Sequence, residues 1–233
     1  MTKPTENFVR WYLRFNGYLG VENLIVHEPV PGAVPQGAEF DVVAVRFPFS
    51  CEVADFRLTR HVKLEAIEKP GVINFVIAEV KGGRDTKLNE IWMPVPESEE
   101  AKNKLQLNRL EYLVRWLGFC ESGQAVESVA TDLRRTGRSD REHAVRVIYF
   151  GARRSQQADD RKIPMILLED IAQWIVCTRA GSWKDKGLAN RSCHDQWDPL
   201  IKNVWNLADP DLPGSEVEKV RSILAIVLGR VAP

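Results

Sequence analysis

The chain has 233 residues, of which 44% are hydrophobic, so it is long enough to bury a substantial core. These values exclude a disulfide-stapled miniprotein and a disordered tail. Thirty-two Lys and Arg balance thirty-two Asp and Glu, which gives a formal net charge of zero. The chain as a whole therefore lacks the basic field that would indicate a nucleic-acid partner, and the local distribution of charge matters more.

The four cysteines lie far apart in the sequence and form no CxxC pair, which indicates a reduced, cytoplasmic protein. The N-terminus turns polar within a few positions. The apolar stretch ILAIVL near the C-terminus is much shorter than the roughly 20 residues that span a bilayer. We therefore expect no signal peptide and no membrane partner.

The first predicted element is a helix that begins at Thr5, its N-cap, and ends at Gly17. Apolar residues recur along it every three or four positions. A strand is predicted over residues 23–28. The β-branched stretch EFDVVAVRF (residues 39–47) predicts a second strand.

The middle of the chain predicts two strands and a long helix. FRLTRHVKLEAI (residues 56–67) alternates apolar and charged residues, as a half-exposed strand does. VINFVIAEVK (residues 72–81) is a nearly continuous apolar run, typical of a strand covered on both faces. A helix with Ser98 as its N-cap follows and ends at Gly118.

The C-terminal part begins with a buried-type strand, AVRVIYFG (residues 144–151), and a short strand that runs into a helix over residues 163–176. The last helix is predicted over residues 215–228. Helices and strands in this order indicate a mixed α/β domain around a central sheet. We expect this domain to comprise residues 1–180, and residues 181–233 to form a helical C-terminal extension packed on its core.

Charged side chains stand at the ends of two apolar strands. Glu79 and Lys81 close the run VINFVIAEVK, and they point to the same side because side chains alternate along a strand. Asp41 lies near the start of EFDVVAVRF. If the two strands are neighbours, Asp41 and Glu79 converge at one edge of the sheet. Two carboxylates and a main-chain carbonyl, here that of Val80, are the ligands that Mg²⁺ or Mn²⁺ prefers.

The succession TENFVRWYLRFNGY, GAEFDVVAVRF and FVIAEVKGG, followed by a helix, resembles the PD-(D/E)XK, or restriction-endonuclease-like, nuclease superfamily. The resemblance covers about residues 5–175 and implies an αβββαβ core. It implies that Asp41 and Glu79 bind Mg²⁺ and that Lys81 assists hydrolysis. The interval between Asp41 and Glu79 is long for this family, which leaves room for an inserted hairpin.

Three further residues have weaker claims to the site. Some members of the family use a glutamate on the first helix, and Glu6 matches that position, although a glutamate in a first turn also complements the helix dipole. Gln106 is similar to a polar residue that some members place near the site, whereas a solvated helix residue is the simpler interpretation. Glu39 competes with Asp41, since it lies two residues earlier on the same face.

The pattern predicts a Mg²⁺-dependent nuclease that hydrolyses phosphodiester bonds of nucleic acid, DNA in particular. Defence against foreign DNA and DNA repair are both compatible with the family. An alternative is a catalytically inactive nuclease-like subunit that binds nucleic acid or builds a larger complex, and a homodimer is also possible. A third interpretation is a metal-free interaction protein in which Glu79 and Lys81 merely form ion pairs.

A local excess of positive charge lies in the second half of the chain. The segment from Arg134 to Lys162 holds nine basic and four acidic residues. This excess predicts either a surface for the phosphate backbone of nucleic acid or a solvated loop face.

Overall fold

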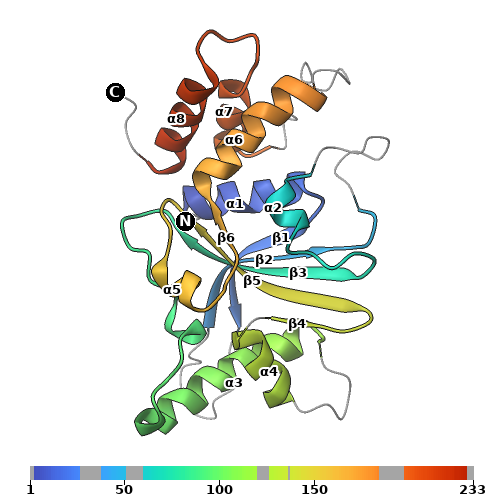
Figure 1. The fold of residues 1–233 in the computed structure, drawn as a ribbon, viewed down its shortest axis with the longest axis vertical. Coiled ribbons are helices and arrows are strands. Elements are labelled where there is room, and N and C mark those ends of the chain that lie inside the picture. Colours follow the sequence, from blue (N-terminus) through green and yellow to red (C-terminus); the bar gives the residue numbers. More distant parts are fainter. Residues whose placement is uncertain are drawn as a thin grey trace.

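The computed structural model describes residues 3–26, 38–50, 60–119, 126–135, 137–183 and 197–229. Within these residues the centre of the fold is an open, mixed sheet of six strands (Figure 1). The strands are β1 (Leu19–Val26), β2 (Ala38–Arg46), β3 (Ile73–Lys81), β4 (Arg138–Ser139), β5 (His143–Gly151) and β6 (Met165–Leu167). Their order is β1-β2-β3-β5-β4, and β6 also pairs with β5.

The sheet changes from antiparallel to parallel pairing at β3. Strands β1, β2 and β3 follow one another in antiparallel pairs, whereas β3, β5 and β6 are parallel neighbours. A parallel pair needs a crossover connection, and helical segments supply it here between β3 and β5. The neighbouring placement of β2 and β3 confirms the arrangement that the site prediction required.

Helices cover both faces of the sheet (Figure 1). On one face lie α1 (Pro4–Phe15), α6 (Leu168–Thr178), α7 (Pro199–Leu207) and α8 (Glu216–Val227). On the other lie α3 (Glu100–Trp116) and α4 (Val126–Arg135). The shorter helical segments are α2 (Val62–Glu65), α5 (Gln156–Asp160), η1 (Glu90–Trp92), η2 (Glu97–Glu99) and η3 (Arg179–Trp183).

Alternation along β3 assigns its side chains to the two layers. Ala78 and Val80 belong to the hydrophobic cluster that contains α1, whereas Ile77 belongs to the cluster that contains α3 and α4. Glu79 and Lys81 therefore lie on the α3–α4 face of the sheet.

The C-terminal helices share a hydrophobic core with the N-terminal helix. Ile201, Trp205 and Ile223 belong to the same buried cluster as Phe8 of α1. The domain boundary expected between residues 180 and 181 falls inside η3. None of the helices in the described residues has the length and hydrophobicity needed to cross a bilayer.

The alternating segment 56–67 is the clearest departure from the predicted elements. Residues 56–59 lie outside the described residues, and the strand prediction is wrong for residues 60–67, which contain the helical turn α2. Leu64 is fully buried while Val62 is largely exposed, although both would share one face of a strand. The main-chain amide of His61 donates to Asn16 Oδ1, so a tertiary contact holds this segment in place of a strand ladder.

Two predicted helix starts are also wrong. Lys3 rather than Thr5 is the N-cap of α1, and Pro4 takes the first helical position, where its missing N–H costs nothing. Glu99 rather than Ser98 is the N-cap of α3, because the short turn η2 precedes it.

Candidate active site

Strands β2 and β3 place Asp41 and Glu79 opposite each other. Their pairing runs from Arg46–Asn74 to Val42–Ala78, so Asp41 and Glu79 are the next residues outward on the two strands. The ladder between the strands ends at this point. Strand β2 continues alongside β1 to Ala38, and β3 continues alongside β5 to Lys81. The two carboxylates therefore stand where the sheet divides.

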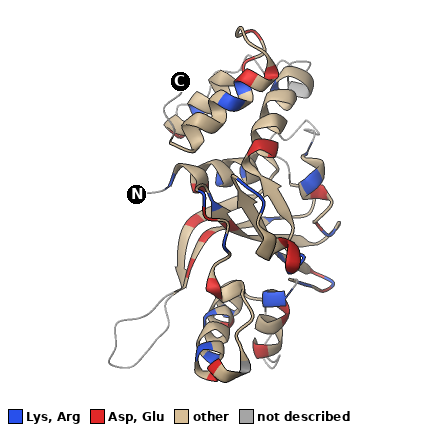
Figure 2. Cartoon of the chain, turned by 60° about the vertical axis from the view of Figure 1, so that its left-hand side comes forward, with Lys and Arg blue, Asp and Glu red and all other residues tan. Residues whose placement is uncertain are grey.

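A kink in β1 accompanies this division. Asn23, which lies opposite Asp41 in the β1–β2 pair, has φ of 51°, a left-handed conformation that Asn tolerates better than most residues. Val42 packs in the core beneath α1, whereas Phe40, two residues earlier, packs in the other core. These two side chains would share a face in a regular strand, so β2 turns over at Asp41. In Figure 2 the β1–β2 ribbon extends beyond the rest of the sheet.

Glu79 is held by donors from three residues. It is 5% exposed; its Oε1 accepts from the Asn89 amide at 2.9 Å and pairs with Lys81 Nζ at 2.7 Å. Its Oε2 accepts from Trp92 Nε1 at 3.0 Å. These contacts offset the cost of burying the carboxylate and fix its orientation. One lone pair of Oε2 stays available for a further partner.

Asp41 is partly buried and accepts from the main-chain amide of Val80 through Oδ2, at 2.7 Å. Burial raises the pKa of Asp41 to about 6, and the charges of Glu79 and Glu6 raise it as well. The Val80 amide and Lys81 act in the opposite direction. Within the described residues Asp41 Oδ1 has no hydrogen-bond donor. The site therefore concentrates negative charge that few protein groups neutralise.

Glu6 of α1 adds a third carboxylate near the same strand ends. It is 1% exposed, its Oε1 pairs with Lys3 Nζ at 2.7 Å, and its Oε2 is buried with no hydrogen-bond partner in the described residues. The start of α1 contacts the end of β3 directly, because a Cβ atom built on Gly82 would lie 2.4 Å from Thr5 Cγ2. A buried carboxylate oxygen without a donor is costly, which makes the helix-dipole explanation for Glu6 incomplete.

Sequence reasoning missed three residues that contact or influence the carboxylates. Asn89 and Trp92 come from the loop and turn after β3, and no motif marks them. Tyr149 of β5 lies beside Glu79 in the parallel ladder. Burial raises the pKa of Tyr149 to about 12, and the charges of Glu79 and Asp85 contribute.

The remaining predicted residues have other surroundings. Gln106 is buried rather than solvated, and its Oε1 accepts from Arg134 Nη2 at 2.9 Å. Val80 contributes its amide to Asp41, while a role for its carbonyl stays a prediction. Glu39 is exposed, so the burial of Asp41 favours Asp41 between these two.

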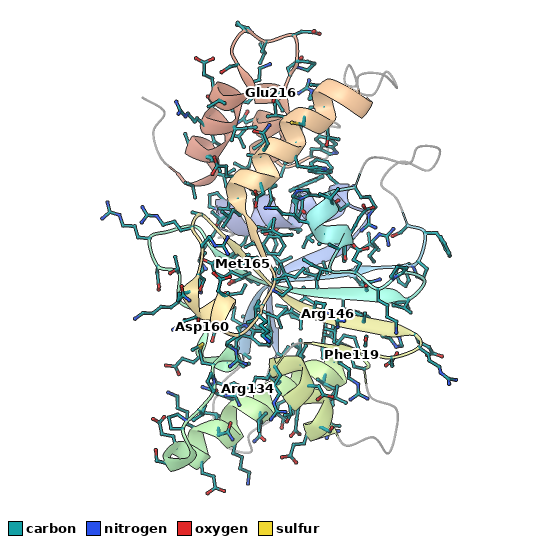
Figure 3. All side chains as sticks on the ribbon, viewed as in Figure 1. Phe119, Arg134, Arg146, Asp160, Met165 and Glu216 are labelled. Carbon is teal, nitrogen blue, oxygen red and sulfur yellow. The ribbon has the colours of Figure 1, made fainter. Side chains whose placement is uncertain are left out.

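Much of the basic excess between Arg134 and Lys162 is used inside the fold. Figure 3 labels Arg134 in the α3–α4 layer and Arg146 on β5. Arg146 Nη1 donates to the carbonyls of Arg138 and Val145, and Arg161 Nη2 donates to the carbonyl of Arg134. A smaller, exposed part of the excess remains available to a partner.

The exposed part lies beside the carboxylates. Arg153 is exposed in the segment after β5 and forms no ion pair within the described residues, whereas the neighbouring Arg154 pairs with Asp159. This segment adjoins the end of β3, since the Ala152 amide donates to the Lys81 carbonyl at 2.9 Å. Ser155 Oγ also donates to the Thr86 carbonyl at 2.6 Å, which ties the loops after β3 and β5 together.

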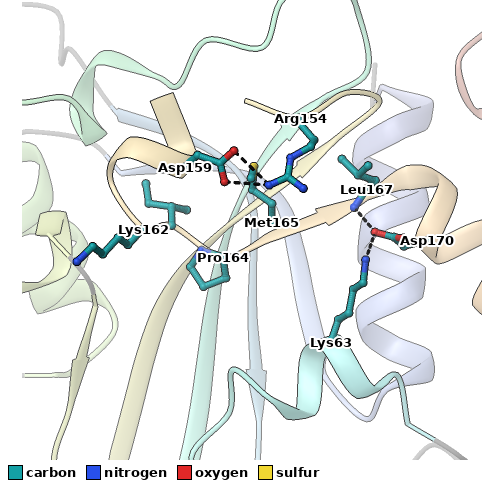
Figure 4. A pocket seen from close by; sticks show the side chains of 9 residues that line it. Lys63, Arg154, Asp159, Lys162, Pro164, Met165, Leu167 and Asp170 are labelled. Carbon is teal, nitrogen blue, oxygen red and sulfur yellow. Dashed lines mark hydrogen bonds and ion pairs between the residues drawn. The ribbon is translucent and has the colours of Figure 1, made fainter. Parts of the chain in front are cut away.

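A pocket of about 330 Å³ lies near β6 and α2 (Figure 4). Its basic residues include Arg154, which pairs with Asp159, and Lys63, which pairs with Asp170. Asp41, Glu79 and Lys81 are not among its lining residues. This pocket therefore does not belong to the candidate active site.

Among the described residues no three His, Cys, Asp or Glu side chains are grouped closely enough to hold a metal ion by themselves. Mg²⁺ needs fewer protein ligands, because it is commonly held by one or two carboxylates with water completing its shell. Asp41 Oδ1 and Glu79 Oε2, which accept one hydrogen bond or none within the described residues, are oxygen ligands of the kind that such an ion takes. Comparisons with protein-family models, curated proteins and solved structures found no match to this chain.

Proposed function

We propose that this chain is a Mg²⁺-dependent nuclease of the PD-(D/E)XK type, which hydrolyses phosphodiester bonds in DNA. The observation that supports the proposal best is the position of Asp41 opposite Glu79, with Lys81 Nζ 2.7 Å from Glu79 Oε1. Acid, acid and lysine stand together at the end of otherwise apolar strands, where burial of charge is costly without a chemical role.

In this proposal Asp41 and Glu79 hold the metal ion, with the Val80 carbonyl as a third ligand. Glu6, whose buried Oε2 has no hydrogen-bond partner among the described residues, adds negative charge beside Asp41. Among the described residues the ammonium groups of Lys3 and Lys81 pair with Glu6 and Glu79, and no ion pair is formed by Asp41, so a cation at the site would neutralise negative charge. A divalent ion held there supplies positive charge against the phosphate and acidifies water.

The side chains of the chain itself position the reacting groups. Trp92 and the Asn89 amide fix the carboxylate of Glu79, so its free lone pair keeps one direction. Lys81 is anchored at Glu79 and partly exposed, which lets its ammonium group donate to a phosphate oxygen or to the attacking water. The Lys81 ammonium group would then already be in position to stabilise the negative charge that develops on the phosphate.

The substrate class follows from the charge around the site. Arg84 and Lys87 are exposed on the loop after β3, and Arg153 is exposed on the neighbouring loop after β5. None of the three forms an ion pair within the described residues. Exposed cations beside a metal site suit the phosphate backbone of nucleic acid, which is bound through charge rather than sequence.

A cleavage assay tests the proposal. The purified chain is incubated with single-stranded, double-stranded and branched DNA and with RNA, in Mg²⁺, in Mn²⁺ and in EDTA. We expect cleavage of DNA that requires the metal ion. Glu79→Gln and Lys81→Ala should each reduce cleavage by at least about 100-fold.

The control is Arg221→Ala, which removes an exposed cation of α8 and should leave cleavage unchanged. Equal cleavage by the wild type, Glu79→Gln and Lys81→Ala would overturn the proposal. Retarded migration of DNA without cleavage in any metal would instead favour an inactive nuclease-like binding subunit.

A further inference from the structure

A second pocket, of about 290 Å³, lies in the helical layer on the α3–α4 face of the sheet. Three arginines line it, Arg134 and Arg135 from the end of α4 and Arg161 from the turn after α5. Asn103 and Thr131 add polar groups to its wall. The pocket is therefore strongly basic in a protein with no net charge.

The arginines of this pocket have no carboxylate partner in the part of the chain that the structure describes. Arg134 is 9% exposed, and it donates only to neutral acceptors: Asn103 Oδ1, Gln106 Oε1 and the Met93 carbonyl. Arg161 donates to the carbonyl of Arg134. Neutral acceptors satisfy hydrogen bonds but leave the positive charges uncompensated.

Three other arginines with buried Nε atoms differ in this respect, whereas Arg109 of α3 also has a buried Nε and no carboxylate partner among the described residues. Arg46 and Arg60 pair with Glu68, and Arg179 pairs with Asp209. The basic residues in the pocket of Figure 4 likewise include two with carboxylate partners. The Arg134 pocket differs from these places because it gathers three arginines without a carboxylate partner in the described residues, of which Arg134 is buried and Arg161 half-buried.

The positive charges of Arg134 and Arg161 also repel each other. Burial lowers the pKa of Arg134, and the charge of Arg161 lowers it further. The Nε atoms of both residues are buried without an acceptor in the described residues. An anion in the pocket would relieve this repulsion.

We propose that this pocket binds the phosphate group of a ligand. Guanidinium groups match phosphate geometry with paired N–H donors, and a phosphate brings enough negative charge to compensate more than one arginine. The Thr131 hydroxyl offers a further donor at the wall. The pocket lies apart from Asp41 and Glu79, neither of which lines it, so this inference does not depend on nuclease activity.

Titration calorimetry with inorganic phosphate tests the proposal, at constant ionic strength and in EDTA so that the metal site plays no part. We expect saturable binding to the wild type, weakened at least tenfold in Arg161→Gln and severalfold in Arg135→Gln. Arg135 is exposed, so its substitution should not disturb the fold. The control Arg115→Gln removes an exposed arginine from α3 and should bind as the wild type does.

The same titration with a nucleoside 5′-monophosphate and with a short oligonucleotide distinguishes the two sources of the phosphate. Tighter binding of the monophosphate indicates a free nucleotide, and tighter binding of the oligonucleotide indicates the backbone of nucleic acid. Either result supports the pocket only if Arg161→Gln and Arg135→Gln weaken it. The absence of saturable binding, or equal affinities for Arg135→Gln and Arg115→Gln, would overturn the proposal.

Discussion

The main-chain amide of Val80 donates to Asp41 Oδ2 at 2.7 Å, just beyond the last paired residues of β2 and β3. The Asp41 carboxylate thus accepts a hydrogen bond from the Val80 N–H group at the place where β2 and β3 separate. It joins the strands through a side chain where their backbones no longer pair. Asp41 accepts from the backbone through Oδ2, whereas its Oδ1 has no donor among the described residues.

Asp41→Asn separates these two roles. The amide oxygen can still accept from Val80, while the negative charge beside Glu79 and Glu6 disappears. We expect the free energy of unfolding in EDTA to stay within about 1 kcal/mol of the wild type or to rise, because a hydrogen bond of this kind contributes about that much. Stabilisation by added Mg²⁺ should be lost. Urea unfolding in EDTA and in Mg²⁺ measures both quantities, and a loss of several kcal/mol in EDTA would contradict the expectation.

Trp92→Phe tests the donor to Glu79. The smaller ring keeps an aromatic contact with Phe40 but removes the N–H that Glu79 Oε2 accepts. We expect a loss of about 1–3 kcal/mol in the free energy of unfolding, together with slower DNA cleavage. Trp116→Phe is the matched control, since Trp116 is 56% exposed. Similar losses in both variants would show that the Trp92 hydrogen bond is unimportant.

Gly82→Ala tests the contact between α1 and the end of β3. The new Cβ would clash with the Thr5 side chain, so either this side chain or α1 must shift, and a shift of α1 would carry Glu6 with it. We expect lower stability and weaker Mg²⁺ binding in calorimetry. Gly83→Ala should change neither, because its nearest atom would be 3.9 Å away. Adding Thr5→Ala to Gly82→Ala should restore much of the loss, and failure of this rescue would contradict the steric explanation.

His61 should make stability depend on pH. Burial lowers the pKa of His61 from its usual 6.5, Lys63 lowers it further and Asp170 opposes both. Its Nδ1 lies 2.6 Å from the Tyr12 hydroxyl. Below about pH 6.5 the unfolded chain takes up a proton at this residue that the folded chain resists, so the His61 contribution to stability falls as the pH falls.

The measurement is the free energy of unfolding at pH 7.5 and at pH 5.5. His61→Gln should reduce the difference between the two values. An unchanged difference in His61→Gln would assign the pH dependence to other groups.

The sequence predicted correctly those elements whose structure is determined by their own hydrophobic pattern. Strands β2, β3 and β5 are apolar runs that need burial, and their bounds agree with the prediction to within a residue or two. Gly17 ends α1 with φ of 87°, as its position predicted. The strand prediction for residues 60–67 was wrong because apolar and charged residues alternate there as they do in a strand. The contacts of His61 and the burial of Leu64 determine the structure of this segment instead.

The candidate site was predictable where strand alternation determines it and unpredictable where loops do. Asp41 and Glu79 follow from two neighbouring strands, and Lys81 follows from period two. Trp92 and Asn89 come from an irregular segment, where no periodicity links sequence to position. Trp116 at the end of α3 is 56% exposed, and an amphipathic pattern does not reveal which flank of a helix stays uncovered.

The change from antiparallel to parallel pairing at β3 has a consequence for the order of folding. Strands β1, β2 and β3 close through comparatively local connections, whereas β5 joins β3 only after the chain has passed through α3 and α4. When two strands far apart in the sequence pair, closing the long loop between them costs chain entropy before the new contacts stabilise the pair. We therefore expect the strands that carry Asp41 and Glu79 to associate early. The neighbouring loop with Arg153 would then take its place later, when β5 pairs with β3.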